Sequence, residues 1–381
     1  MTDLLNSSQV RVITYNVLCS HLAPAHRFRN CKPENLEANT RLERVKSKLD
    51  KETSVRAICC LQEVGMQWCS ELHSFFAARD YVMVHTLYGR DDANFMGVCI
   101  AFPRDKFAMI ECDIVRTADT KPWPVPPVVA VPAPSVLGVL KNLVATPLAT
   151  LSAFLLRAWK LPMSLWNSIT SLSRPSFPPL TNMLGQQQDC WEMSRRRQNQ
   201  QILLRLRPRQ PDGTPDPRKP SFCVSTYHMP CVFWDQRVMT IHSTLAARYV
   251  QRKAGSDPYI LAGDFNIKPF SGAYSLLTQG KLDAAHPDHP PPRQDDPWKM
   301  ELEEGMESAY AKVQGREPDF TNYAQINREE PFIDCIDYIF HKPGMKAITC
   351  DTLPGRAVAR GPLPTADEPS DHILLGAEYE I

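Results

Sequence analysis

A carboxylate and an amide separated by one residue follow an apolar stretch near residue 260. Tyr259–Ala262 is apolar, and Gly263, Asp264, Phe265 and Asn266 come directly after it. On an extended backbone, residues two apart point the same way, so Asp264 and Asn266 project together while Phe265 points back toward the core. A carboxylate beside an amide can hold a water, a hydrated Mg²⁺ or a phosphoryl oxygen. An Asx turn that only caps a strand gives the same pattern, so this stretch alone leaves both interpretations open.

The same kind of polar ending recurs along the chain. Polar residues follow apolar runs at three further points, one acid lies within such a run, and an acid–histidine pair leads into the last run: Asn16, Glu63, His228, Asp337, and Asp371 with His372. Strands that cross one core bring their ends to one edge, so we expect these side chains to meet. Acids and amides are hard oxygen ligands for Mg²⁺, and the two histidines suit charge stabilisation on phosphorus. Together they predict metal-assisted phosphoester hydrolysis.

Composition narrows the classes of protein. The chain has 381 residues, is 43% hydrophobic and carries a net charge of +1, which disfavours a protein that coats nucleic-acid duplexes. Its 12 cysteines include no Cys-x-x-Cys, which argues against a zinc site and for thiols in a reducing compartment. Residues after Met1 lack the pattern of a signal peptide. We therefore expect a cytoplasmic protein.

Many short strands and fewer helices must position these residues. β-branched and apolar runs predict strands at residues 10–17, 57–64, 81–87, 96–102, 107–115, 199–207, 221–227, 259–262, 335–340 and 373–380. Apolar positions at helical spacing predict helices that start at Asn39 or Thr40 and over residues 68–78, 240–251, 271–278 and 305–311. The organisation indicates one domain over residues 9–381.

Residues 119–187 break the pattern and predict an insertion within that domain. A Pro- and Val-rich run over 121–134 is followed by an apolar region over 135–173 with helical spacing. The longest uncharged run, 142–156, is shorter than the roughly 20 residues that a membrane span needs. We therefore exclude a transmembrane helix. Three interpretations stay open: a helical lid, a helix lying on a membrane surface, or a helix that contacts a protein partner.

The ordered motifs resemble the endonuclease/exonuclease/phosphatase superfamily, the deoxyribonuclease-like fold. The resemblance rests on Thr-Tyr-Asn16-Val-Leu, Leu-Gln-Glu63-Val, His228 after a strand, Gly-Asp264-Phe-Asn266, Ile-Asp337-Tyr-Ile-Phe and Pro-Ser-Asp371-His372. It covers the chain except residues 119–187 and the loop at 281–297. The fold that it implies is α/β, a four-layer sandwich of two mixed β-sheets packed face to face with helices outside. The site is then expected at one edge of the sandwich.

The resemblance also implies a role for each site residue. Glu63 would be the principal Mg²⁺ ligand, with Asn16 and Asp371 close to the metal and Mn²⁺ as the alternative ion. Asp264, helped by Asn266, would position or deprotonate the attacking water. His228 and His372 would hold the scissile phosphate, and Asp337 would orient a histidine. The implied reaction is in-line attack on phosphorus without a covalent enzyme intermediate.

Within the superfamily, Phe320-Thr321-Asn322-Tyr323 before Ile336–Phe340 resembles the branch of mRNA deadenylases, nocturnin and the angel proteins. This similarity implies substrate contacts from stacking aromatics and nearby amides, or else ordinary loop packing of the same residues; the candidates are Asn199, Phe233, Trp234, Phe320 and Asn322. Two departures concern the substrate. The deadenylases usually have Asn-Thr-His where this chain has Thr226-Tyr227-His228, and no leucine-rich repeat region precedes Val10.

Three functions follow, in order of preference. The first is a Mg²⁺-dependent 3′–5′ exoribonuclease of the poly(A) type that acts on single-stranded RNA. The second is a phosphatase or phosphodiesterase on a dinucleotide, an inositol phosphate or a phospholipid head group. The third is a catalytically silent binding module, which the complete set of site residues disfavours. Residues 135–173 could add a peripheral membrane or protein contact, and docking through leucine-rich repeats is not expected.

Overall fold

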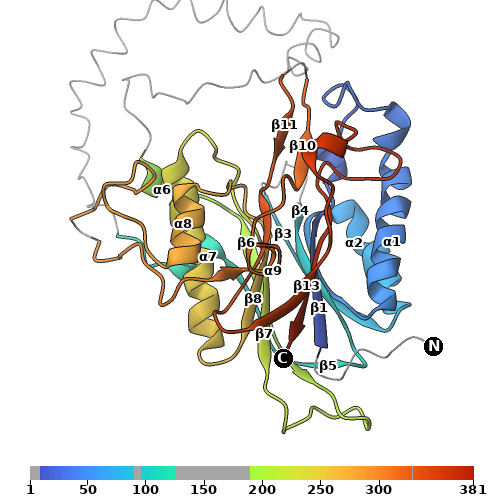
Figure 1. Ribbon diagram of the computed structural model, residues 1–381, viewed down its shortest axis with the longest axis horizontal. Coiled ribbons are helices and arrows are strands. Elements are labelled where there is room, and N and C mark those ends of the chain that lie inside the picture. The colour runs from blue at the N-terminus through green and yellow to red at the C-terminus, as the bar shows by residue number, and fades with distance from the viewer. Residues whose placement is uncertain (1–8, 90–95, 125–188, 295, 328) are drawn as a thin grey trace, which may run out of the picture. The chain divides into compact units, whose positions relative to one another are not determined.

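Two six-stranded β-sheets form the centre of the computed structural model, which describes residues 9–89, 96–124, 189–294, 296–327 and 329–381 (Figure 1). The first sheet has the order β13 (Lys346–Cys350), β14 (Leu375–Glu380), β1 (Gln9–Asn16), β2 (Ile58–Gly65), β4 (Met96–Pro103) and β3 (Tyr81–Tyr88). The second has the order β5 (Phe107–Arg116), β6 (Gln200–Pro208), β7 (Phe222–His228), β8 (Tyr259–Asp264), β12 (Asp337–His341) and β9 (Glu307–Ser308). A separate hairpin joins β10 (Asn322–Ala324) and β11 (Phe332–Asp334).

Each sheet contains one parallel pair of strands in an otherwise antiparallel arrangement. In the first sheet β1 runs parallel to β2, and in the second β7 runs parallel to β8. The carboxyl ends of a parallel pair lie at the same edge of the sheet, which places Asn16 beside Gln62 and His228 beside Asp264. β12 runs antiparallel to β8 and begins opposite Asp264, with Asp337. The topology alone therefore brings the ends of these strands to one edge in each sheet.

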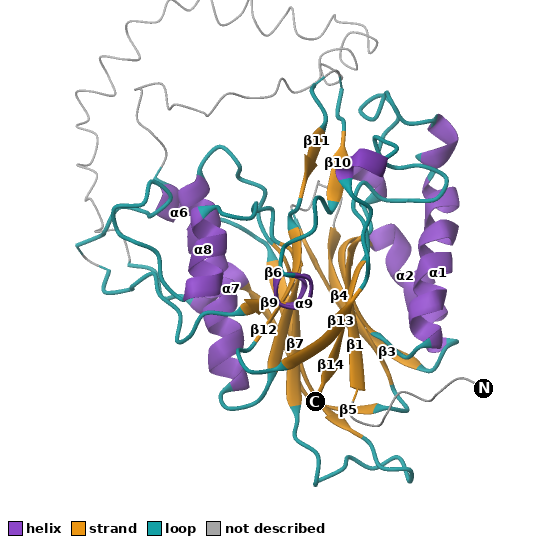
Figure 2. Cartoon of the chain, in the orientation of Figure 1, coloured by secondary structure: helices purple, strands orange, loops and turns teal. Residues whose placement is uncertain are grey.

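Helices cover the outer face of each sheet (Figure 2). On the first sheet these are α1 (Ala38–Ser54) and α2 (Met66–Ala77); on the second they are α6 (Cys190–Arg195), α7 (Gln236–Ala254) and α8 (Gly272–Gln279). α9 (Ala309–Gln314) follows β9, and short 3₁₀ turns lie at Ser20–Leu22, Pro33–Asn35, Thr117–Thr120 and Arg356–Val358. The predicted four-layer α/β sandwich is confirmed.

Three layers of apolar side chains hold these elements together. The middle layer lies between the sheets and includes Val12 of β1, Ile100 of β4, Val224 of β7 and Ile339 of β12. Side chains that point the other way from the same strands pack under α1 and α2, or under α6, α7 and α8. Because the central strands are buried on both faces, they read as continuous apolar runs in the sequence, which is why they were predicted.

Several boundaries differ from the sequence-based expectation. α7 begins after Asp235, whose carboxylate accepts a hydrogen bond from the backbone N–H of Arg237, and not at Thr240. The strand expected over 335–340 begins only at Asp337, so this acid opens β12 and does not lie inside it. The last strand begins at Leu375 and not at Ile373. The helix expected over residues 305–311 occupies Ala309–Gln314 instead. In each case a hydrogen-bonding side chain or a strand partner sets the end, which apolar periodicity does not show.

The two chain segments that flank residues 125–188 lie side by side. The rings of Trp123 and Trp191 meet edge to face with centroids 6.5 Å apart, and Trp191 makes the same contact with Trp298 at 5.7 Å. The ammonium of Lys121 lies within 6 Å of all three ring centroids and pairs with the carboxylate of Asp296. We call these five residues the tryptophan clasp. Lys121 and Trp123, which the sequence analysis placed at the start of the insertion, thus pack with Trp191 and Trp298 on the helical side of the second sheet.

The interpretations offered for residues 135–173 lie outside the described residues. Within the described ranges, no helix combines the length and the apolar character needed to cross a bilayer.

Candidate active site

Side chains from both sheets meet at the edge where β1, β2, β7 and β8 end. The amide nitrogen Nδ2 of Asn16 lies 3.1 Å from Oε1 of Glu63 in its own sheet. The same nitrogen lies 3.0 Å from Oδ2 of Asp264 in the other sheet. Asn16 therefore joins the two sheets at this edge, and all three groups are buried. The sequence-based expectation that the polar strand ends would lie together agrees with this geometry.

Glu63 reaches the site through a distortion of its strand. The register between β2 and β4 shifts between Leu61 and Val64, and Glu63 has a φ of 57°. A β-bulge re-aims a side chain, and a left-handed conformation costs a non-glycine residue of order 1 kcal/mol or more. The backbone N–H of Cys19 donates to the Glu63 carboxylate at 2.9 Å. The chain thus holds this carboxylate in a strained conformation so that it faces Asn16.

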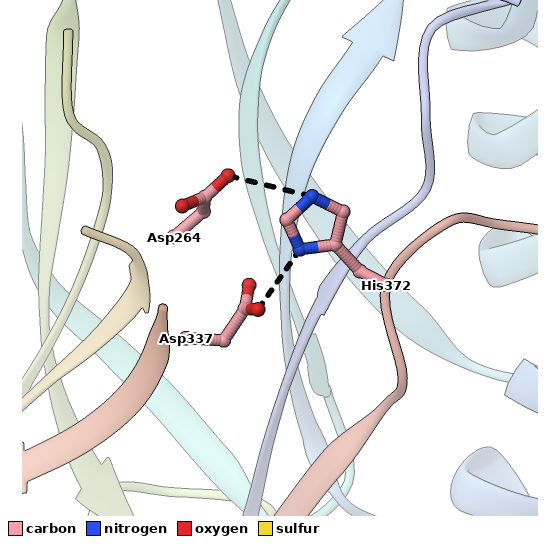
Figure 3. A group of neighbouring side chains, drawn as sticks. All are labelled: Asp264, Asp337 and His372. Atoms are coloured by element: carbon pink, nitrogen blue, oxygen red, sulfur yellow. Dashed lines mark hydrogen bonds and ion pairs between the residues drawn. The ribbon is translucent and has the colours of Figure 1, made fainter. Parts of the chain in front are cut away.

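Asp337, His372 and Asp264 form a chain of polar contacts (Figure 3). The Nδ1 atom of His372 lies 2.8 Å from Oδ2 of Asp337, and its Nε2 lies 3.8 Å from Oδ2 of Asp264. The hydroxyl of Thr321 also donates to Oδ2 of Asp337, at 2.6 Å, and accepts from the backbone N–H of Asp337. Asp337 therefore fixes the orientation of the His372 ring, and Thr321 fixes Asp337.

Burial and neighbouring charges shift the pKa values of Asp264 and His372. Burial raises the pKa of the Asp264 carboxyl above its ordinary value, and the nearby Asp337 carboxylate raises it further. Burial on its own would lower the pKa of His372, but the carboxylates of Asp337 and Asp264 outweigh it and raise that pKa well above the usual value. The structure therefore favours a positively charged His372 between two acids.

His228 faces the site from the last position of β7. Its Nε2 lies 3.5 Å from Oδ2 of Asp264 and 3.9 Å from Oε1 of Glu63. Its Nδ1 lies 2.9 Å from the hydroxyl of Tyr88, which comes from β3 in the first sheet. The side chain of Asn199 donates to the backbone carbonyl of His228 at 2.9 Å. Asn199, predicted as a substrate contact, is thus placed where it supports His228.

The carboxylate of Asp371 is close enough to the fully buried Arg41 for their charges to interact. Its Oδ1 is buried and has no hydrogen-bond partner among the described residues, and burial raises the pKa of the Asp371 carboxyl. The guanidinium of Arg41 donates to the backbone carbonyls of Val17, Leu18 and Pro369 at 2.6–2.7 Å. Arg41 therefore ties the end of β1 to the loop that carries Asp371. Sequence reasoning missed Arg41 because it lies inside a helical pattern of ordinary appearance.

The buried charges at this edge are predominantly negative. Four carboxylates are buried here, those of Glu63, Asp264, Asp337 and Asp371. Within the described ranges, the buried groups whose positive charge would offset them are Arg41, His372 and, when protonated, His228. Oxygen donors with an excess of negative charge suit a hard divalent cation, and two of them, Oδ1 of Asp337 and Oδ1 of Asp371, have no hydrogen-bond partner among the described residues. The donor set therefore fits the predicted metal.

Two groups of side chains could take that ion. Asp264, Asp337 and His372 offer ligand atoms within 4.8 Å of one another. However, the His372 nitrogen that faces Asp337 already makes a hydrogen bond to it, so this group works as a relay of hydrogen bonds. The Glu63 carboxylate accepts two hydrogen bonds, from the amide nitrogen of Asn16 and from the N–H of Cys19, whereas Oδ1 of Asp371 accepts none from the described residues. The assignment of Glu63, Asp371 and Asn16 as ligands stays a prediction.

Asn266 holds the loop after β8 in place. It has a φ of 51°, its N–H donates to Oδ1 of Asp264 at 2.9 Å, and its side-chain amide donates to the carbonyl of Met229 at 3.0 Å. The side chain therefore links the loop after Asp264 to the loop after His228. It supports Asp264 through its backbone N–H, and its role beside Asp264 in positioning the attacking water stays a prediction.

The aromatic candidates divide by exposure. The Phe233 and Trp234 side chains are 71% and 52% exposed on the loop after β7. Phe320 is only 2% exposed, because its ring packs against Tyr323, and this burial contradicts a role as an exposed stacking surface. Asn322 is buried in β10, where it forms a bridge with His372. Burial therefore favours ordinary packing for Phe320, and the role of Asn322 as a substrate contact stays a prediction.

Two further exposed aromatics were not predicted. Phe270, on the loop after Asn266, is 93% exposed and has a φ of 68°. Phe332 in β11 is 38% exposed, and the ammonium of Lys268 lies 5.1 Å from its ring centroid. In the sequence, Pro269-Phe270 after the acidic motif indicates only a turn, so the exposure of the Phe270 ring could not be predicted from it.

Comparison with known proteins agrees with this geometry. The endonuclease/exonuclease/phosphatase family model matches residues 13–372. "Nocturnin" of Drosophila melanogaster is 28% identical over 182 residues, which cover 42% of this chain and 25% of that protein. The "CCR4-Not complex 3′-5′-exoribonuclease subunit Ccr4" of Coccidioides immitis is 31% identical over 133 residues, covering 34% and 17%. The chain thus spans a quarter or less of these two curated relatives.

Solved structures share the fold over almost the whole chain. ANGEL2, described as a 2′,3′-cyclic phosphatase in complex with adenosine-2′,3′-vanadate, superposes with a TM-score of 0.63 at 17% identity, covering 97% of this chain and 95% of that one. The human Nocturnin catalytic domain with bound sulfate gives a TM-score of 0.53 at 13% identity, covering 98% and 94%. The resemblance to the deadenylase, nocturnin and angel branch is therefore confirmed. With the family model matching nearly its whole length, the chain belongs to the endonuclease/exonuclease/phosphatase family.

Proposed function

We propose that this chain is a Mg²⁺-dependent phosphodiesterase, and specifically a 3′–5′ exoribonuclease that removes terminal nucleotides from single-stranded RNA of the poly(A) type. One observation carries the proposal: polar side chains from both sheets converge at a single edge in a buried, negatively charged cluster. A buried cluster of negative charges destabilises the fold unless a cation neutralises it, and such clusters are typical of functional sites.

Glu63 and Asp371, with Asn16 beside them, are the residues that would hold Mg²⁺. When bound, the ion would neutralise charge on the phosphoryl oxygens and on the leaving oxygen. The buried Asp371 oxygen without a partner supports this choice. The strained conformation of Glu63 supports it as well, because such strain persists where a side chain must be aimed at a site.

Asp264 is the group that would accept the proton of the attacking water. Its raised pKa makes it a stronger base than an ordinary aspartate, and the N–H of Asn266 holds one of its oxygens in place. His372, oriented by Asp337, would donate from Nε2 to a phosphoryl oxygen as negative charge develops there. In Figure 3 the Asp264 carboxylate and Nε2 of His372 face each other, and the Asp337 carboxylate faces Nδ1 of the same ring.

The exposed aromatics support a substrate that contains bases. In the described part of the chain, Phe233, Trp234, Phe270 and Phe332 are the exposed phenylalanines and tryptophans, and all lie on loops or the hairpin at the site edge. Aromatic faces stack on unpaired bases with little dependence on sequence, at about 1–3 kcal/mol per base. The +1 net charge fits a short bound segment and not a long track.

A second candidate reaction is hydrolysis of a terminal 2′,3′-cyclic phosphate. The superposition on ANGEL2, whose structure is described as that of a 2′,3′-cyclic phosphatase, favours it. The same buried cluster would serve this reaction, because it also requires water attack on phosphorus. The two candidates differ in the product and not in the site.

One experiment separates these candidates. Purified protein, Mg²⁺ and a 5′-labelled RNA that ends in adenosines would be compared with the same RNA ending in a 2′,3′-cyclic phosphate. A ladder that shortens from the 3′ end supports the exoribonuclease; loss of the cyclic phosphate without shortening supports the second reaction. If neither occurs, the RNA proposal is wrong, and phosphate release from dinucleotides and phospholipids becomes the next assay.

Matched variants test the residue roles. Glu63→Gln and Asp264→Asn should each lower the rate by about 100-fold or more while the protein stays folded. Glu307→Gln is the control, because Glu307 lies beside His341 at the opposite end of β12 from Asp337. Equal rates for the three variants would refute the assignment of Glu63 and Asp264.

A further inference from the structure

A buried tyrosine from one sheet contacts a site histidine from the other. The hydroxyl of Tyr88 in β3 lies 2.9 Å from Nδ1 of His228 in β7, and both side chains are buried. None of the roles assigned above uses Tyr88. The contact is nevertheless with the ring nitrogen that faces away from the acids, so it bears on which nitrogen of His228 carries the proton.

The direction of this hydrogen bond follows from the partners. Burial, together with the nearby Glu63 carboxylate, raises the pKa of the Tyr88 phenol well above its usual value, so the hydroxyl keeps its proton. The phenol proton is therefore available for donation to Nδ1 of His228, 2.9 Å away. On the other side of the ring, Nε2 faces two carboxylates, those of Asp264 and Glu63. A donor on one side and acceptors on the other place the ring proton on Nε2.

A second tyrosine–histidine pair in the same molecule shows the arrangement with its direction fixed. The hydroxyl of Tyr227 lies 2.9 Å from Nδ1 of His242, and Nε2 of His242 lies 3.1 Å from the backbone carbonyl of Ser194. A carbonyl can only accept, so Nε2 of His242 carries the proton and Nδ1 accepts from Tyr227. Both side chains are fully buried on the outer side of the second sheet, and their hydrogen bonds go to each other and to Ser194, not to a side chain of the site.

We propose that Tyr88, supported by Asn199, is a positioning residue that holds His228 as the Nε2–H tautomer, so that His228 acts at this site as a hydrogen-bond donor and not as a base. The inference rests on the proposed function for the group that receives this bond, a phosphoryl oxygen. It assigns different partners to the two histidines: a neutral phenol behind His228 and a carboxylate behind His372.

The two partners also predict different behaviour. A carboxylate behind an imidazole stabilises its charged form, whereas a phenol fixes the tautomer of the neutral ring without adding charge. Asp264 remains the base of the proposed reaction, and His228 supplies a hydrogen-bond donor. Loss of the Tyr88 hydroxyl should lower kcat, because the orientation of the donor matters most as charge develops on phosphorus, and should leave KM nearly unchanged.

The test uses Tyr88→Phe with Tyr227→Phe as the matched control, since each removes one hydroxyl from a buried bond of equal length. The ring nitrogens of ¹⁵N-histidine-labelled protein are observed by NMR without metal or substrate, and the His228 signals are assigned by their loss in His228→Gln. We expect wild-type protein to show a protonated Nε2 and an unprotonated Nδ1. In Tyr88→Phe the ring should populate both tautomers, with kcat lower by about 10- to 100-fold. In Tyr227→Phe the His228 signals and kcat should match wild type.

Each other result overturns the proposal. A protonated Nδ1 in wild-type His228 refutes it directly, whether or not the Tyr88 variant folds. An unchanged kcat in Tyr88→Phe refutes the positioning role, and an equal fall in Tyr227→Phe shows a general packing effect. Because the tautomer is read from the ligand-free protein, it is decided even if the chain proves inactive on RNA. Inactivity of wild type would then count against the proposed function and not against the tautomer.

Discussion

Replacement of Arg41 by lysine should lower the stability of the protein while keeping a positive charge beside the site. The guanidinium donates to three backbone carbonyls, those of Val17, Leu18 and Pro369. Lysine keeps the positive charge, but its single ammonium cannot reach both Pro369 and the end of β1. A hydrogen bond from a charged group contributes about 1.5–3 kcal/mol, so losing two of them should lower the free energy of unfolding by about 3–6 kcal/mol.

The same substitution should also reduce activity, because the bonds to Val17 and Pro369 hold the segments that carry Asn16 and Asp371. Urea unfolding followed by circular dichroism gives the stability, and RNA cleavage gives the rate. Arg44→Lys is the control on the same helix, since Arg44 donates only to Asn35 and Thr365. If both variants lose the same stability, or Arg41→Lys loses under about 1 kcal/mol, the reasoning from buried charged bonds is wrong.

Three further predictions concern acid stability, substrate binding and the insertion. Burial lowers the pKa of His242 from 6.5 to about 4, so between these pH values the unfolded chain binds a proton that the folded chain does not. The free energy of unfolding is therefore unaffected by His242 above about pH 6.5 and should fall by about 3 kcal/mol on its account by pH 4. Unfolding measured against pH should show this slope, and His242→Gln should flatten it. Replacing Phe233 and Trp234 by alanine should raise the KM for adenosine-ended RNA by about tenfold or more and leave kcat largely unchanged, whereas unchanged KM would remove the stacking role. Deleting residues 125–180 should leave a folded protein by circular dichroism, and an unfolded product would show that this segment belongs to the core.

The edge position of the site was predictable because its signals are local. A continuous apolar run followed by one polar residue marks the end of a buried strand, and this pattern identified Asn16, Glu63, His228 and Asp264. Parallel strands then bring such ends together without any information about side-chain contacts. The geometry that the sequence concealed is the strain at Glu63, because a positive φ at a glutamate leaves no mark on composition or periodicity.

The supporting residues could not be found in the same way. Tyr88 and Arg41 act through contacts with segments far away in the sequence, and each lies in a strand or helix where its type is unremarkable. The exposure of loop aromatics was also hard to predict. Phe320 was a candidate for stacking or for ordinary packing and is buried against Tyr323, whereas Phe270 was overlooked and is almost fully exposed. Whether a loop aromatic is covered depends on neighbours that only the tertiary structure supplies.

The tryptophan clasp gives the protein an optical signal of its own. The ring of Trp191 lies edge to face with that of Trp123 at 6.5 Å and with that of Trp298 at 5.7 Å, and the buried ammonium of Lys121 lies near all three rings. The indole transitions of these neighbouring pairs should therefore couple, and their emission should respond to the charge. Near-ultraviolet circular dichroism and intrinsic fluorescence would then report on the flanks of residues 125–188, together with the chain's four other tryptophans. Loss of these signals before the far-ultraviolet signal, during heating, would mark the opening of this corner as an event separate from unfolding of the sheets.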